Sequence, residues 1–137
     1  MNFPALSIQR VEQIVADACK PDSFQGKRIL LIVPDSTRTA PVGLLFKSIY
    51  QRIGSVAGAF DVLVALGTHQ PMSEAAICER LEISSDERNG KYRSVGFYNH
   101  EWNNPAALKE VGALEPDEVQ TLTNGLFSMR VPVEINR

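Results

Sequence analysis

The chain has 137 residues, a formal net charge of -2 and 44% hydrophobic residues, values typical of one globular domain. Its acidic and basic residues are interspersed, which gives no basic patch for nucleic acid or for an anionic membrane. It contains no run of 18 apolar residues, and its start, MNFPALSIQRVEQ, lacks the basic segment and apolar core of a signal peptide. Cys19 and Cys78 are isolated and predict buried or half-buried thiols in a reducing compartment. The sequence therefore predicts a cytoplasmic protein with no nucleic-acid or membrane partner.

Hydrophobic periodicity predicts strands that alternate with helices along the chain. The predicted elements, in chain order, are a helix over 7–19 capped by Ser7, a strand over 28–33, a helix over 42–53, a strand over 61–66, a helix over 73–81, a strand over 93–98, a helix over 116–124 and a strand over 131–135. The first strand is apolar almost throughout, which favours burial on both faces of a parallel sheet. Residues 84–92 predict a polar turn, and residues 103–112 predict a polar segment that becomes helical.

This alternation predicts an α/β fold with a mostly parallel open sheet, helices on both faces and a Rossmann-like topology in a single domain. Two polar loops, Asp35–Thr39 and Gly67–Pro71, directly follow the first two strands. Ligands bind outside the carboxyl ends of strands in open α/β sheets, so we expect Arg38 and His69 to face one crevice. The alternative is an ordinary strand–turn–helix junction in which Asp35 caps the following helix.

The residue types in these loops suit a small anionic ligand. Arg38 carries a planar donor fork for a carboxylate or phosphate, and Asp35 could orient it or accept a hydrogen bond from a ligand hydroxyl. His69 can exchange a proton near neutral pH. Further hydroxyl and backbone N–H groups come from Ser36, Thr37 and Thr68. These loops therefore carry the functional prediction, because nucleotide-binding, zinc-protease and hydrolase motifs are absent from the sequence.

The second histidine, His100, follows the third predicted strand. It could form a third wall of the crevice, but a structural pairing with Glu101 is the favoured interpretation. Trp102 is interpreted as a packing residue.

The two loop segments resemble the N-terminal domain of the nickel-dependent lactate racemase family. Residues 35–41, DSTRTAP, are similar to the family's D-x-T-R-x-x-P segment, and residues 65–73, ALGTHQPMS, are similar to its A-L-G-T-H-R-P-x-[ST] segment. The Asn99-His100 pair and the ending VPVEINR are also similar to that family. The resemblance covers most of the chain from about residue 27 to residue 137.

The resemblance implies a two-domain isomerase that interconverts stereoisomers of a small 2-hydroxy acid. Residues 1–137 would form its N-terminal α/β domain, and its own C-terminal domain, which is absent from this chain, would be a partner. The implied cofactor is a nickel-pincer nucleotide, a pyridinium mononucleotide that holds nickel. Hydride would pass from the substrate's α-carbon to this cofactor and back, through a ketone intermediate. The cofactor would thus supply the electron sink that is needed because the α C–H is barely acidic.

The resemblance also implies roles for individual residues. His69 would be an acid/base on the substrate hydroxyl, Arg38 and Thr68 would bind substrate, and the loop Asp35–Arg38 would contact the cofactor. No metal ligand is expected in this chain. The cofactor tether, the nickel ligand and a second catalytic histidine are expected beyond Arg137, so residues 1–137 alone are expected to be inactive.

Two positions depart from the family pattern: Gln70 replaces an arginine and Thr39 replaces a proline. Either change could alter the choice of substrate, and a sugar acid is an alternative to a lactate-type acid. Two other classes of function stay open, namely a small-anion or nucleotide-binding module without catalysis and a purely structural interaction domain. The polar loops argue against the structural domain, and the sequence specifies no oligomeric state.

Overall fold

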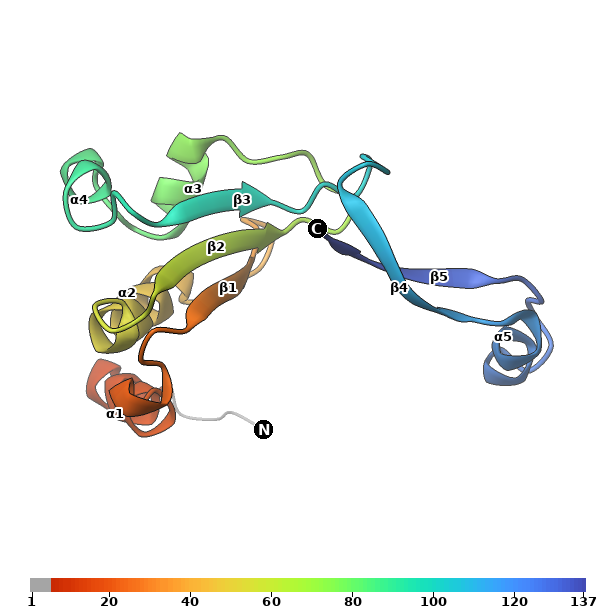
Figure 1. Ribbon diagram of the computed structural model, residues 1–137, viewed down its shortest axis with the longest axis horizontal. Coiled ribbons are helices and arrows are strands. Elements are labelled where there is room, and N and C mark those ends of the chain that lie inside the picture. The colour runs from red at the N-terminus through yellow and green to blue at the C-terminus, as the bar shows by residue number, and fades with distance from the viewer. Residues whose placement is uncertain (1–5) are drawn as a thin grey trace. The chain divides into compact units, whose positions relative to one another are not determined.

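The structure, a computed structural model, describes residues 6–137 as two compact units. Residues 6–66 and 70–99 form the first unit, and residues 67–69 and 100–137 form the second (Figure 1). The first unit contains α1 (Ile8–Ala18), the 3-10 turn η1 (Pro21–Ser23), β1 (Arg28–Pro34), α2 (Val42–Ile53), β2 (Ala59–Ala65), α3 (Glu74–Arg80), α4 (Ser85–Asn89) and β3 (Gly96–Asn99). The second contains β4 (Leu108–Leu114), α5 (Pro116–Leu122) and β5 (Val131–Asn136). No helix in the described part of the chain is long and apolar enough to cross a membrane.

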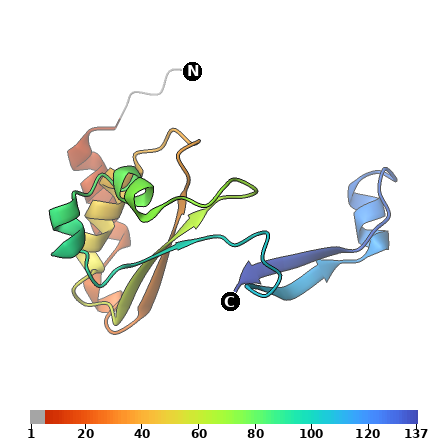
Figure 2. The same ribbon diagram turned by 90° about the horizontal axis from the view of Figure 1, so that it is seen from above.

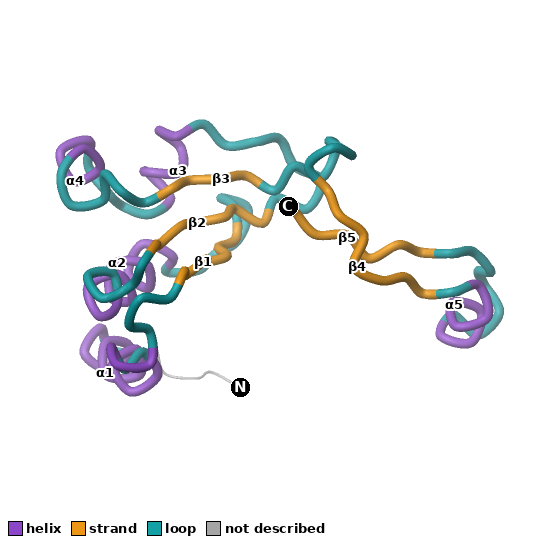
Figure 3. The backbone as a smooth tube through the Cα atoms, viewed as in Figure 1, coloured by secondary structure: helices purple, strands orange, loops and turns teal. Residues whose placement is uncertain are grey.

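The first unit is built on a three-stranded parallel sheet in the order β1-β2-β3 (Figure 3). Helix α2 connects β1 to β2, and α3 and α4 connect β2 to β3, as parallel pairing requires. The predicted α/β class and its parallel sheet are confirmed.

The core lies on one face of this sheet. Alternate side chains of β2, Phe60, Val62 and Val64, are buried there against α2, and the helices of this unit lie on that side (Figure 2). The Phe46 ring on α2 is fully buried, with its centroid 5.1 Å from that of the buried Tyr92 ring. This aromatic cluster fixes α2 against the sheet.

The opposite face of the sheet is largely exposed. Leu30 and Ile32 on β1 are 54% and 62% exposed, and Tyr98 on β3 is 54% exposed. The expectation that the first strand is buried on both faces is therefore wrong. The physical reason is that the strands lie in chain order, so crossovers of the usual right hand place their helices on one face of the sheet and not on the two faces that were predicted.

Helix ends follow the capping chemistry of the sequence. The Ser7 side chain accepts a hydrogen bond from the backbone N–H of Arg10, which confirms it as the N-cap of α1. Residues 84–92, predicted as a turn, instead contain the short helix α4. Ser84 and Glu87 form a reciprocal capping box at its start, so the S-x-x-E spacing was the signal for this helix.

The second unit is an antiparallel ribbon of β4 and β5 with α5 between them. The helix expected within 103–112 is wrong, because β4 begins at Leu108 and pairs with the correctly predicted final strand. Its register shifts between Glu110 and Gly112, which marks a bulge. The bulge disrupts the alternation of apolar residues that identifies a strand in sequence.

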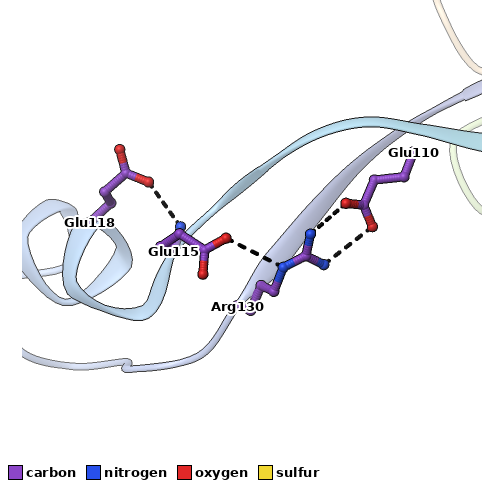
Figure 4. Close-up of polar contacts among 4 residues, drawn as sticks. All are labelled: Glu110, Glu115, Glu118 and Arg130. Atoms are coloured by element: carbon purple, nitrogen blue, oxygen red, sulfur yellow. Dashed lines mark hydrogen bonds and ion pairs between the residues drawn. The ribbon is translucent and has the colours of Figure 1, made fainter.

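An arginine links the two strands of this ribbon (Figure 4). Arg130 donates hydrogen bonds to both carboxylate oxygens of Glu110, one of them at 3.2 Å from Nη1 to Oε2, and its Nε lies 3.4 Å from Oε1 of Glu115. The Glu118 carboxylate accepts a hydrogen bond of 2.8 Å from the backbone N–H of Glu115. The hydrogen bonds from Arg130 lower the pKa of Glu110.

Replacing Arg130 with Gln is therefore expected to raise the pKa of Glu110 toward its ordinary value. A carboxyl whose pKa is lowered in the folded state stabilises the fold above its unfolded pKa and loses that contribution as the pH falls through the folded pKa. Carboxyl-carbon NMR titration of Glu110 measures the change. Arg52→Gln, which removes the same charge from an exposed position on α2, is the control. An equal Glu110 midpoint in wild-type protein and Arg130→Gln would contradict this account.

Candidate functional site

The two polar loops start from the same edge of the parallel sheet. In the register of β1 and β2, Pro34 lies opposite Ala65, so both strands end at the same level. This confirms the arrangement of strand ends on which the predicted crevice depends. Arg38 belongs to the first compact unit and His69 to the second, so their sharing of one crevice stays a prediction.

Asp35 organises the first loop from within. Its side chain is only 5% exposed, and its Oδ1 accepts hydrogen bonds from the backbone N–H of Thr37 at 3.1 Å and from the Thr37 hydroxyl at 2.6 Å. A buried carboxylate requires such donors, and a turn closed on the residue two positions later supplies them. The alternative that Asp35 caps the next helix is wrong, because α2 begins after Pro41 without a side-chain cap.

Arg38 lies at the exposed part of this loop, while its backbone is fixed. Its carbonyl accepts hydrogen bonds from the backbone N–H of Ala40 at 3.1 Å and from Nη2 of Arg80 at 2.7 Å. Ser36 and Thr37 are also exposed. The loop therefore presents the Arg38 guanidinium and the Ser36 hydroxyl to solvent, because the Thr37 hydroxyl donates to Asp35, and these two groups are suitable donors for an anion.

The second loop also has an ordered backbone. Gly67 has a φ of +60°, a conformation that L side chains rarely adopt, so the turn after β2 favours glycine. The His69 carbonyl accepts a hydrogen bond of 3.1 Å from Nε1 of Trp102, and Thr68 and His69 are exposed. Trp102, interpreted from sequence as packing, thus also fixes the backbone of the predicted catalytic residue.

Asn99 fixes the far end of the second loop to the end of β3. Its Oδ1 accepts from the backbone N–H of Met72 at 3.0 Å, and its Nδ2 donates to the Met72 carbonyl at 2.9 Å. The sequence favoured a pairing of His100 with Glu101. In the structure, the Glu101 carboxylate instead accepts a hydrogen bond of 2.8 Å from Nδ2 of Asn104. The Asn99-His100 pair therefore contributes to the loop through its asparagine.

Sequence reasoning missed the role of Arg80. It ends α3, where an arginine is commonplace because it complements the helix dipole. Its two acceptors, the carbonyls of Pro34 and Arg38, are 46 and 42 residues away in sequence. Local pattern carries no signal for such a contact.

The donor set of these loops fits an anion. Among residues 6–137, no group of three or more His, Cys, Asp or Glu side chains could hold a metal. Guanidinium, hydroxyl and backbone N–H groups are the donors that phosphate and carboxylate require. The described residues could thus contact the anionic parts of a nucleotide or an acid.

The parallel sheet with polar loops at its carboxyl edge defines an open α/β protein of the class that binds ligands at strand ends. Within this class, the chain belongs to the family described as the lactate racemase N-terminal domain, whose model matches residues 9–124. This match includes both polar loops and the residues that tie them.

The chain is also similar to a solved crystal structure of a protein from Thermotoga maritima, with a TM-score of 0.82 and 28% sequence identity. The similarity covers 100% of this chain and 31% of the Thermotoga maritima chain. This chain thus spans less than a third of the length of that relative. Among curated proteins, none matches it.

Proposed function

We propose that this chain is the N-terminal catalytic part of an isomerase that racemises or epimerises a 2-hydroxy acid. The observation that carries the proposal is the lactate racemase N-terminal domain match over residues 9–124, which contains both loops at the carboxyl edge of the sheet. A hydroxy acid has a carboxylate and a hydroxyl next to the reacting carbon. The two loops offer a guanidinium for the first and an imidazole for the second.

In this proposal each loop has one task. Arg38 binds the substrate carboxylate, and Asp35, buried beneath the loop, holds the turn that carries Ser36 and Thr37 toward the cofactor. His69 takes the proton from the substrate hydroxyl oxygen and returns it there, with Thr68 beside it. An ordered backbone on both loops supports this assignment, because acid–base chemistry requires the reacting groups to be held in place.

The proposed cofactor is a nickel-pincer nucleotide, which when bound would supply the hydride acceptor for the α-carbon. The polar loop of residues 35–38 has the donors to hold its phosphate. The tether and the nickel ligands belong, in this proposal, to a part of the protein outside this chain. Residues 1–137 alone are therefore expected to be inactive.

A further domain is part of the proposal. The sheet face that carries Leu30, Ile32 and Tyr98 is exposed, and the similar Thermotoga maritima chain is more than three times as long. Exposed apolar surface of this kind is typical of an interaction site. We infer that additional chain packs on these units. A cytoplasmic location is also proposed, supported by the free thiols of Cys19 and Cys78.

The test is to incubate the complete, cofactor-loaded protein with one pure enantiomer of lactate and, separately, with one epimer of a sugar acid. Chiral chromatography would then follow appearance of the opposite configuration. We expect one substrate to reach an equilibrium mixture. A protein that binds the acid, as detected by calorimetry, but leaves its configuration unchanged would favour the alternative of a binding module without catalysis.

A further inference from the structure

The first loop is held at both ends by a single side chain from another element. Arg80, the last residue of α3, donates from Nε to the carbonyl of Pro34 at 3.3 Å and from Nη2 to the carbonyl of Arg38 at 2.7 Å. Pro34 is the last residue of β1, and Arg38 is the residue that we assign to the carboxylate. The guanidinium therefore spans the segment that includes Asp35 and Thr37.

A guanidinium is the side chain suited to this task. Its donors lie in one rigid plane and on different nitrogens, so it can satisfy two carbonyls at once. A lysine has one nitrogen and a flexible stem. Hydrogen bonds from charged donors are also stronger than those between neutral groups. Arg80 is half-buried, which reduces the competition from water for these bonds.

The position of α3 also links this contact to the second loop. The helix begins at its N-cap Ser73, directly after the second loop, and Asn99 holds the backbone of Met72 just before it. The chain that leaves the end of β2 therefore continues into α3, and the last residue of α3, Arg80, holds the first loop. Hydrogen bonds within the first unit thus connect the exit of one loop with the backbone of the other.

We propose that Arg80 is a positioning residue, which fixes the backbone of Pro34 and Arg38 so that the Arg38 guanidinium is presented to the substrate carboxylate. The part of this statement that concerns the substrate rests on the proposed function. The part that concerns the loop rests on the two hydrogen bonds alone. The two parts are tested by different measurements on the complete protein.

The effect of Arg80 on the backbone of the first loop is tested by hydrogen exchange of the variants Arg80→Gln and Arg80→Lys. We expect amides of residues 35–40 to exchange at least about tenfold faster in both variants, because the loop loses charged hydrogen bonds, while amides of residues 60–65 exchange as before. Arg52→Gln, the same substitution at an exposed position on α2, is the control and should leave both segments unchanged. Unchanged exchange of the loop in Arg80→Gln, or wild-type exchange in Arg80→Lys, would overturn the proposal.

The effect of Arg80 on substrate binding is tested by NMR of the arginine Nε–H groups during titration with lactate. We expect the Arg38 signal to shift in wild-type protein and to need a several-fold higher lactate concentration in Arg80→Gln. Equal lactate dependence in the two proteins would overturn the positioning role even if the loop exchanges faster. An Arg38 signal in wild-type protein that responds neither to lactate nor, in a parallel titration, to the sugar acid would instead contradict the proposed function, and the exchange result would still decide whether Arg80 holds the loop.

Discussion

Replacing His69 with Ala is expected to lower the rate of 2-hydroxy-acid racemisation by the complete enzyme by about 10²- to 10⁴-fold, the usual contribution of a general acid or base. The proposed reaction needs a group that takes the hydroxyl proton as the hydride leaves, and water replaces an oriented imidazole poorly. His69 is exposed, and Trp102 bonds to its backbone carbonyl rather than to its ring. Alanine keeps this carbonyl, and kcat/KM with lactate or a sugar acid measures the effect of losing the imidazole.

His100→Ala is the matched comparison, because it removes the second of the two histidines. Its rate should fall far less than that of His69→Ala. The thermal midpoint of each variant, followed by circular dichroism, separates loss of chemistry from loss of fold. If His69→Ala keeps the wild-type rate in a protein that racemises its substrate, His69 has no part in catalysis.

Truncating Phe46 to Ala should have the largest effect on stability, a loss of about 3–5 kcal/mol in the free energy of unfolding. The ring is fully buried, and its centroid lies 6.0 Å from Tyr50, 6.4 Å from Phe60 and 5.1 Å from Tyr92. Removing it leaves a cavity where α2 meets the sheet, and the surrounding aromatic rings cannot collapse into it without leaving their own contacts. Urea unfolding followed by circular dichroism measures the loss.

Leu45→Ala is the control for this prediction. Leu45 is the neighbouring residue on α2 but is 37% exposed, so its truncation removes less buried surface and should cost about 1 kcal/mol or less. Equal losses from the two substitutions would show that the aromatic cluster does not hold α2 to the sheet.

Much of the first unit follows from its sequence. The apolar run before Asp35 and the one before Gly67 identify β1 and β2, and polar residues after each mark where the strands end. Capping residues locate the helix starts, as Ser7 does for α1. These elements are predictable because their signals are local: hydrophobic period, caps and turn residues act within a few positions.

The remaining features depend on contacts between distant residues. The sequence of β1 is equally apolar on both faces, and only the strand order shows that Leu30 and Ile32 are exposed. Strand β4 contains a bulge, which disrupts the two-residue alternation of apolar residues that would identify it as a strand. The bonds from Arg80 and Asn99 join the loops to elements formed elsewhere in the chain, so no local pattern reports them.

The two carbonyl acceptors of Arg80 also bear on which residues of the first loop can be replaced. Both are backbone carbonyls, which every amino acid provides, so Arg80 imposes no side-chain identity on the loop that it holds. Residue 39 is Thr here and proline is usual in the resembling family, yet either residue leaves the Arg38 carbonyl in place. The exposed position 39 is thus suitable for randomisation when a new hydroxy acid is sought, with Asp35, Ser36, Arg38 and Arg80 kept constant.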